Sequence, residues 1–564
     1  MGCNGGVDLS ADYSRSMSRA QSRDNWTWLV PALIFGGSAF LYSINLARLP
    51  HPDELYHVLA ARGLLAHGEP RIAEGLYTRV FAFTWLVSQM FALLGESLTA
   101  ARLPSLVAMA TLNTMLFLWL RSQAGSLAAW LGAALFALSP FTLEIAQFAR
   151  FYAFQSLFFF AGCIIVHSLV RRPLPVTARS SGLAAAAALL FALALYTQIT
   201  TLIGLLGLAL WLATVLVVPW LLDPALSTRR KIGLLAILLV IGAALLGALL
   251  ATGLLAEFWH RYRSTPIFLA PRADEFWFYH AFYLIYYPSL WPIIGLLCLA
   301  ALATWPRPTW FAMVVFATGF LLNSFAGAKN LRYVAYAQPF LFILFGLGLA
   351  AIVPWLRRAA DAFGQQLETH LAGFGLAGRG LPRMLLWASL LVALVANAAF
   401  LRTATLLADV TVPPQIPAVR WPEARPLVEP LLSEVDVVVT MAELETLYFW
   451  ERYDILFSPS RLTELADQTE FSADHRTGRP VITTSESLRR VVDCTSSGLF
   501  ISNTHRWGRT NLIDQVTAEF VETTMTRLDL PPELQLVVFA WDHSPVSTAD
   551  DCAAIAEIVR GPDE

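Results

Sequence analysis

The chain has 564 residues, of which 56% are hydrophobic and 14% are charged, and its mean hydropathy is +0.57. Soluble domains carry roughly a quarter charged residues, so this composition excludes an ordinary soluble protein and indicates a polytopic α-helical membrane protein. The formal net charge of −2 gives no sign of a nucleic-acid partner, and none is expected.

Residues 1–25 are polar and are expected to form a cytoplasmic tail. The apolar run that follows is too long for the core of a signal peptide and lacks a small-residue cleavage site, so we predict that it is the first membrane span. A span needs about 20 apolar residues, and residues 26–403 contain about eleven such runs, within a range of about eleven to thirteen. The predicted spans are Trp26–Leu46, Ala101–Leu120, Leu127–Leu143, Phe154–Val170, Leu183–Ile199, Thr201–Leu221, Ile232–Leu255, Phe282–Ala303, Trp310–Phe325, Tyr333–Leu356 and Leu385–Leu401.

One further apolar segment, Val80–Leu94, decides on which side of the membrane the later segments lie. It is short for a span and suits a helix that lies along the membrane surface. If it does not cross, every segment predicted to be cytoplasmic is basic; if it crosses, that bias inverts. We therefore predict a first external loop of about residues 47–100 with interfacial helices, and we expect this loop and residues 404–564 to face outward.

Residues 404–564 change character and are predicted to form a soluble α/β domain, because short apolar strands alternate with a helical segment. The preferred interpretation is a lid or acceptor-docking module without chemistry of its own. Cys494 and Cys552 both fall here, and a periplasmic location would allow them to pair, but the sequence leaves this open. The predicted strands are Asp436–Thr440, Pro480–Thr483 and Leu536–Phe539, and the predicted helix is Ser485–Val492.

The first polar motif, His51–His57, follows the first span and contains adjacent carboxylates, Asp53 and Glu54. Pro52 favours the first turn of a helix, so these carboxylates and His57 would share its opening turns. One interpretation is a general base for an acceptor hydroxyl. A second is a divalent metal bound by Asp53, Glu54 and His57. A third is a helix N-terminus whose acids favour the helix dipole.

The second motif runs from Ser139 to Tyr152 and contains Glu144 and Arg150 at the end of a span. An arginine fork holds phosphate through two hydrogen bonds and stays charged, so Arg150 is a candidate ligand for a lipid phosphate. Glu144 would orient a sugar hydroxyl or pair with Arg150. The alternative is a snorkelling arginine that anchors the helix.

A third motif, Lys329–Tyr333, brings two cations to the outer start of a late span, which suits a phosphate or interfacial anchoring. The loop that contains His260 and Arg261 is aromatic and basic, and it would cover a sugar or a lipid headgroup, or anchor at the interface.

These motifs, in this order, resemble those of the GT-C glycosyltransferases, and most of all the protein O-mannosyltransferase and lipid A aminoarabinose transferase families. The resemblance covers roughly residues 26–356. The segment Leu76–Val80 departs from it, because the family often has Pro-Pro-Leu there. The matching motifs are Asp53-Glu54 after the first span, Arg102-Leu103-Pro104-Ser105, Ser139-Pro140 with Gln147-x-x-Arg150-x-Tyr152, and Arg332-Tyr333 with Pro339.

The resemblance implies a polyprenyl-phosphate-linked sugar donor, an envelope lipid, glycan or protein as acceptor, and inversion in a single displacement. It assigns the base to Asp53 and the donor phosphate to Arg150 and Arg332. No cofactor is expected to be required, although a divalent metal remains an alternative. The expected site has Asp53 and Glu54 as catalytic residues, Arg150, Tyr152, Lys329, Arg332 and Tyr333 at the phosphate, and His57, Glu144, His260 and Arg261 as weaker substrate-binding candidates.

We expect a multi-pass protein of the inner (plasma) membrane whose site faces the periplasm or the outside. Three other functions fit parts of the sequence. A transporter or flippase of lipid-linked saccharides would show repeats and charges at mid-membrane, and the predicted spans are nearly free of charge. A saccharide ligase would use a longer donor and a large late external loop. A non-catalytic scaffold would not require the acids and arginines to face one side.

Overall fold

The computed structural model describes residues 28–171, 177–264, 275–371, 384–385, 388–389, 398–410, 417–459, 469–508, 512–546 and 552–560. Two predictions lie outside these residues, namely the tail 1–25 and most of the span Leu385–Leu401.

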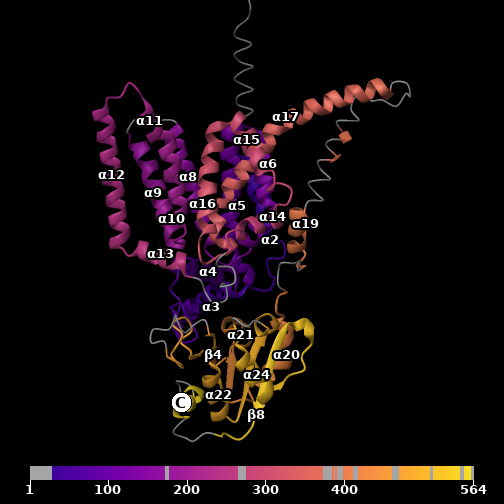
Figure 1. Ribbon diagram of the computed structural model, residues 1–564. Helices are drawn as coiled ribbons and strands as arrows, with labels where there is room; N and C mark the ends of the chain where they lie inside the picture. The colour runs from indigo at the N-terminus through magenta and orange to yellow at the C-terminus, as the bar shows by residue number, and fades with distance from the viewer. Residues whose placement is uncertain are drawn as a thin grey trace, which may run out of the picture.

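Apolar helices dominate the first two thirds of the chain (Figure 1). Among the described residues, six helices are long and apolar enough to cross a membrane, or seven if a pair bent by 63° counts as one span. The expected number of eleven stays a prediction. The six are α5 (Leu98–Ala124), α8 (Tyr152–Arg171), α9 (Ala178–Thr197), the run Thr201–Leu222 formed by α10, η1 and α11, α12 (Thr228–Ala251), and the run formed by η3 (Leu331–Ala337) and α17 (Gln338–Leu371).

Prolines interrupt two of the predicted spans. The bent pair is α6 (Ser126–Ala137) and α7 (Pro140–Ala146), where Ser139 caps α7 and Pro140 begins it. The prediction of one continuous span over Phe282–Ala303 was wrong. That segment contains the shorter helices α14 (Phe278–Tyr286) and α15 (Ile294–Thr304), separated by a stretch with two prolines, which cannot donate to a helix ladder.

Two further apolar helices belong to the bundle, and a third lies beside it in the predicted first external loop. They are α2 (Leu29–Ser43), α16 (Pro306–Ser324) and the helix of the first external loop, α4 (Phe81–Leu94). At 14 residues, α4 is shorter than a span, and its position along the membrane surface stays a prediction.

The first external loop also contains α3 (Pro52–His67) and the hairpin of β1 (Arg71–Ile72) and β2 (Gly75–Leu76). A capping box fixes the start of α3, because His51 accepts from the backbone of Asp53 and the Glu54 side chain accepts from the backbone of His51. The helix ends at Gly68 in the left-handed conformation, at φ 76°.

The C-terminal region, Trp421–Arg560, is built on a six-stranded sheet of order β5-β4-β3-β6-β8-β7. All three predicted strands and the predicted helix are present, and Thr484 caps that helix. A disulfide joins Cys494 to Cys552. The strands are β3 (Val437–Thr440), β4 (Ile455–Phe457), β5 (Val481–Ile482), β6 (Ser497–Asn503), β7 (Thr526–Arg527) and β8 (Leu536–Asp542); the helices are α20 (Trp421–Leu432), α21 (Glu443–Trp450), α22 (Ser485–Cys494), α23 (Thr504–Trp507), α24 (Gln515–Thr524) and α25 (Ala553–Arg560).

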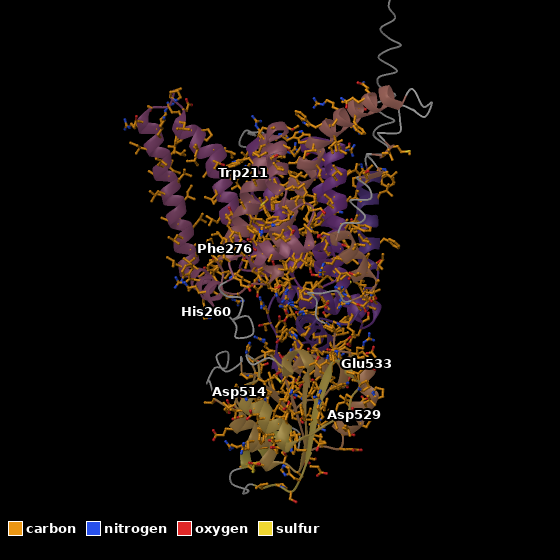
Figure 2. All side chains as sticks on the ribbon, turned by 45° about the vertical axis from the view of Figure 1, so that its right-hand side comes forward. Trp211, His260, Phe276, Asp514, Asp529 and Glu533 are labelled. Carbon is orange, nitrogen blue, oxygen red and sulfur yellow. A yellow bond between two sulfur atoms is a disulfide. The ribbon has the colours of Figure 1, made fainter. Side chains whose placement is uncertain are left out.

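Side chains of the sheet alternate between two cores. Val438 belongs to a core that continues through the first external loop into the apolar helices, whereas Val437 and Val439 belong to a second core beneath α22 and α24. Figure 1 shows α3 and α4 between the helical bundle and the C-terminal region, with α21 packed against α3. Figure 2 shows the same division, with Trp211 in the bundle and Asp529 in the C-terminal region. A single core therefore fixes this region against the loop that carries Asp53.

Candidate active site

Asp53 lies in the first turn of α3 and forms an ion pair with Arg332, which lies 279 residues later in the chain. Its Oδ2 lies 2.5 Å from Nη1 of Arg332, and its side chain keeps a third of its exposure. Arg332 is held in place by Asn330, whose Oδ1 accepts from its Nε at 3.1 Å. The loop before η3 therefore delivers a charged, partly exposed guanidinium to the carboxylate that opens α3.

The neighbouring charges hold the pKa of the Asp53 carboxyl well below its usual range. Burial by itself would raise this pKa, but the guanidinium groups of Arg332 and Arg150 outweigh it. Asp53 is therefore ionised throughout the physiological pH range, which is the state that accepts a proton.

Arg150 is buried beside Asp53, with 5% of its surface exposed. Its Nη1 donates to the backbone oxygen of Asp53 at 2.8 Å and to the hydroxyl of Tyr77 at 3.3 Å. Its own backbone oxygen accepts from Ser105, in the Arg-Leu-Pro-Ser motif of α5. Two external segments and one span thus locate this guanidinium.

Aromatic rings surround the arginines. The guanidinium of Arg332 lies 5.1 Å from the ring centre of Phe148 and 5.7 Å from that of Tyr152. Arg150 lies 5.0 Å from the ring centre of Phe151. Tyr333 follows Arg332 and lies within electrostatic range of Tyr152. Ring faces attract cations, so they stabilise the guanidinium groups without neutralising them.

Sequence reasoning missed one residue of this cluster, Arg79. Its guanidinium lies 5.2 Å from the ring centre of Phe151, and its charge interacts with those of Arg150 and Arg261. Arg79 stands in the segment that departs from the family pattern, so the resemblance gave no reason to select it. The site thus brings two arginines to one carboxylate, with Arg79 as a third cation near Arg150, and it can hold an anion.

Glu54, although adjacent to Asp53, is fully engaged by hydrogen bonds. Its two oxygens accept from Nε and Nη2 of Arg102, both at 2.8 Å, and from the backbone of Ala149 and His51, both at 2.9 Å. Arg102 has no exposed surface and also donates to backbone oxygens before α3. Glu54 therefore joins α3 to α5 and to the segment before Arg150. Asp53 is the carboxylate of the two that keeps an exposed surface.

His57 is packed rather than presented to the site. Its Nδ1 lies 2.8 Å from the Thr84 hydroxyl, and aromatic rings contact it edge-on. Burial lowers the pKa of His57 well below its ordinary value, and the charges of Arg150 and Arg79 lower it further. Asp53, Glu54 and His57 therefore turn to different partners, and no group of three or more His, Cys, Asp or Glu side chains among the described residues could hold a metal ion.

The remaining candidates lie at the edge of this cluster. Glu144 accepts from the Tyr286 hydroxyl at 2.8 Å, so it faces α14 rather than Arg150. Lys329 is buried and donates to the backbone oxygen of Ala326 at 2.7 Å, near the end of α16. His260 lies exposed on α13 (Leu254–Arg263; Figure 2). Arg261 is also exposed on this helix and pairs with Glu257 at 2.8 Å.

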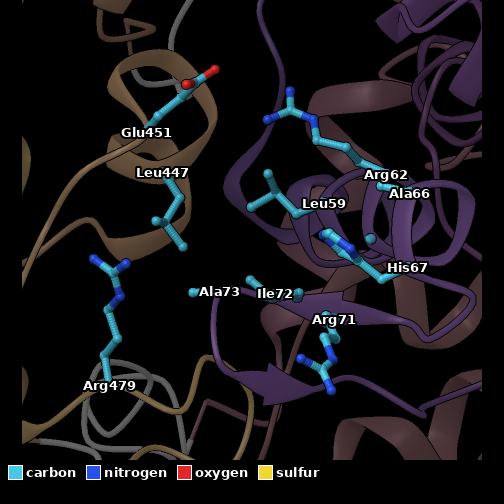
Figure 3. A pocket seen from close by; sticks show the side chains of 11 residues that line it. Leu59, Arg62, Ala66, His67, Arg71, Ile72, Ala73, Leu447, Glu451 and Arg479 are labelled. Atoms are coloured by element: carbon cyan, nitrogen blue, oxygen red, sulfur yellow. The ribbon is translucent and has the colours of Figure 1, made fainter. Parts of the chain in front are cut away.

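A cavity of about 360 Å³ lies elsewhere, between the C-terminal half of α3, the hairpin and the C-terminal region. Arg62, Arg71 and Arg479 surround it (Figure 3). Each of these arginines already pairs with a glutamate of the first external loop. The cavity does not include Asp53, so it is separate from the cluster described above.

Comparison with solved structures gives a consistent likeness across nearly the whole chain. ArnT from Cupriavidus metallidurans bound to undecaprenyl phosphate matches with a TM-score of 0.57 and 15% identity, over 93% of this chain and 99% of that one. The oligosaccharyltransferase AglB from Archaeoglobus fulgidus, in complex with an inhibitory peptide and a dolichol-phosphate, matches with a TM-score of 0.52 and 12% identity, over 84% of this chain and 70% of that one.

No protein-family model matches the chain, and no curated protein matches it in sequence. The likeness is therefore one of fold. The apolar bundle, the segment of residues 47–100 with α3 and α4, and the sheet-containing C-terminal region together have the GT-C fold that ArnT and AglB share.

Proposed function

We propose that the chain is a membrane glycosyltransferase that moves a sugar from a polyprenyl-phosphate donor to an extracytoplasmic acceptor. The observation that carries this proposal is the meeting of Asp53 with Arg150 and Arg332 at one end of the apolar bundle, where α3 meets the start of the η3–α17 run. A carboxylate base and a phosphate-binding cluster are the two groups that such a transfer needs. The fold likeness to structures that contain undecaprenyl phosphate and dolichol phosphate supports the donor class.

In the proposed mechanism, the donor lipid lies in the bilayer and its phosphate contacts Arg150, Arg332 and Arg79. Asp53 takes the proton of the acceptor hydroxyl while that oxygen attacks the anomeric carbon. The bond from the anomeric carbon to the phosphate oxygen breaks, and polyprenyl phosphate leaves with one more negative charge. The arginines stabilise that developing charge, and the single displacement inverts the anomeric centre.

The ion pair between Asp53 and Arg332 implies that the donor phosphate also controls the basicity of Asp53. Without a phosphate, Arg332 neutralises the carboxylate and weakens it as a base. A donor phosphate competes for the same guanidinium and frees Asp53 from it. The base would therefore reach its full strength only when the sugar to be attacked is in place.

The proposed location is the inner (plasma) membrane, with the site and the C-terminal region facing the periplasm or the outside. The basic character of the predicted cytoplasmic segments supports this orientation. The disulfide between Cys494 and Cys552 supports it independently, because disulfides persist in oxidising compartments. The acceptor is an envelope lipid, glycan or protein, and the sugar is a hexose or a pentose.

The decisive test is a turnover assay with purified protein, a panel of polyprenyl-phosphate sugars and envelope acceptors, with and without a chelator. We expect release of polyprenyl phosphate, and a fall of about 10²–10⁴-fold in the Asp53→Asn variant, because that variant lacks the base. The matched control is Glu96→Gln, which replaces an exposed carboxylate of the same loop. A chelator that abolishes turnover would assign a role to a metal.

The same variant separates the base from the binding site. Asp53→Asn releases Arg332, so it should bind undecaprenyl phosphate about 3–10-fold more tightly, the size of one partly exposed ion pair. Near-normal turnover in Asp53→Asn would defeat the proposal. Movement of intact lipid-linked sugar across vesicles, without release of polyprenyl phosphate, would identify a flippase instead, and transfer only from long oligosaccharide donors would identify a ligase.

A further inference from the structure

The C-terminal region binds the β1–β2 hairpin (residues 71–76) through backbone hydrogen bonds and an ion pair. The backbone N–H groups of Glu74 and Gly75 donate to the Thr477 oxygen at 3.0 and 2.9 Å, and Arg479 pairs with Glu74 at 3.0 Å. A Cβ on Gly75 would lie 2.5 Å from the backbone nitrogen of Gly478, so the two backbones touch where no side chain fits. The hairpin is therefore fixed to the segment 474–479.

The same segment holds Tyr56 of α3. Nη1 of Arg476 donates to the Tyr56 hydroxyl at 2.8 Å, and its guanidinium lies 5.2 Å from the centre of the Tyr56 ring. The Tyr56 hydroxyl in turn donates to Oε1 of Glu443, in α21, at 3.3 Å. Two charged residues of the C-terminal region thus determine where this buried ring lies.

Tyr56 connects the C-terminal region to the candidate active site through its contact with Tyr77. Its ring stacks on that of Tyr77, with centroids 5.1 Å apart and planes inclined by 16°. Tyr77 directly follows the hairpin, and its hydroxyl accepts from Arg150 at 3.3 Å. The stacked Tyr56 ring and the hairpin, which is bound to the segment 474–479, therefore both fix the position of the Tyr77 hydroxyl that accepts from Arg150.

Arg150 depends on that oxygen. Among the described residues its Nε is buried without a hydrogen-bond partner, and Nη1 makes the contacts to Asp53 and Tyr77. Removal of the Tyr77 contact leaves the guanidinium held by the Asp53 backbone oxygen, the Tyr152 side chain and the Phe151 ring, with one fewer contact to keep it turned toward a phosphate.

We propose that Arg476, Glu443 and Tyr56 are positioning residues for Arg150, and that the C-terminal region thereby sets the geometry of the donor-phosphate site. This inference rests on the function proposed above. It adds a role on the donor side to a region whose sequence suggests only a lid or an acceptor-docking module.

The test measures binding of undecaprenyl phosphate, KM for donor and acceptor, and the melting temperature of the full-length protein in detergent. Tyr56→Phe, Arg476→Gln and Tyr77→Phe should each weaken lipid-phosphate binding about 3–10-fold, the net effect of one ordinary lost hydrogen bond. They should raise KM for the donor and leave KM for the acceptor unchanged. Arg476→Lys should restore part of the loss, because it keeps a cation near the Tyr56 hydroxyl.

Two comparisons distinguish positioning from a general loosening of the interface. Tyr448→Phe is the matched control, because Tyr448 belongs to α21 and contacts Arg62 but not Tyr77. In a double-mutant cycle, Tyr56→Phe and Tyr77→Phe should be strongly non-additive, since both act through one contact. Equal losses in Tyr448→Phe, or additive losses in the cycle, would overturn the inference.

The inference and the proposed function fail in different ways. If Arg150→Ala weakens lipid-phosphate binding while Tyr56→Phe, Arg476→Gln and Tyr77→Phe bind like the wild type, the positioning role is overturned and the donor site stands. If the wild type itself does not bind undecaprenyl phosphate, or Arg150→Ala binds as well as the wild type, the proposed function is overturned and the inference with it.

Discussion

At the scale of single residues, two adjacent carboxylates have different surroundings. Glu54 accepts from four donors, two of which belong to the fully buried Arg102. Loss of one partner of such a buried pair costs about 3–5 kcal/mol, because a charge is left buried alone. Asp53, one residue earlier, keeps open surface and one cation that a phosphate would attract. Sequence alone presents them as an equivalent pair, because the residues that separate their roles lie 48 and 279 positions away.

The depressed pKa of Asp53 gives a prediction about pH. A carboxylate whose pKa lies below its ordinary value acts as a base at every pH above that lowered pKa, and fails only as the pH falls through it. We therefore expect kcat/KM of the wild type to show no acid limb from Asp53 between about pH 8 and pH 5. The Arg332→Gln variant lacks the cation that lowers the pKa of Asp53 most, so burial should raise this pKa. The acid limb should therefore move to higher pH.

The measurement is the pH dependence of kcat/KM for both proteins with the same donor and acceptor. An acid limb at the same pH in both would show that Arg332 does not control the ionisation of Asp53.

At the scale of elements, the external parts of the fold are where sequence and structure agree best. Three of the six strands in the C-terminal region, β3, β5 and β8, were found from short apolar runs, whereas β4, β6 and β7 were not predicted. The break between α14 and α15 was missed, because hydropathy averages over Pro288 and Pro292, whose effect is on the backbone. The hairpin was missed because its two-residue strands have no periodicity and exist through contacts with the segment 474–479.

The disulfide between Cys494 and Cys552 gives a prediction at this scale. It closes a loop across 58 residues and ties α22 to α25, so it restricts the unfolded chain strongly. Cys494→Ser should destabilise the C-terminal region by about 2–4 kcal/mol and accelerate its digestion by a protease. Cys298→Ser, which removes a buried free thiol from α15, is the control. A wild type whose digestion rate is unchanged by a reductant would contradict a stabilising disulfide.

At the scale of the whole molecule, composition and charge bias were enough to predict the class of protein, and the order of motifs was enough to predict the fold. The meeting of Asp53, Arg150 and Arg332 was foreseen only as a consequence of placing all three on one side of the membrane. Their direct contacts, and the link from Glu443 through Tyr56, span hundreds of residues and follow from packing that no local pattern encodes.

Sidedness is the prediction that belongs to this scale. If the C-terminal region faces outward, a protease added to intact spheroplasts should digest it, whereas an epitope at the N-terminus should be digested only after the membrane is permeabilised. A known cytoplasmic protein serves as the control for intact membranes. Protection of the C-terminal region in intact spheroplasts would reverse the orientation and place the candidate active site on the cytoplasmic side.

The contact between Gly75 and Gly478 has a consequence for engineering. Because the two backbones meet without room for a side chain, the hairpin and the segment 474–479 form a single transferable unit. A chimera that takes its C-terminal region from one protein and its first external loop from another should assemble poorly unless both pieces come from the same parent. Attempts to change acceptor choice by exchanging the C-terminal region should therefore carry the hairpin along.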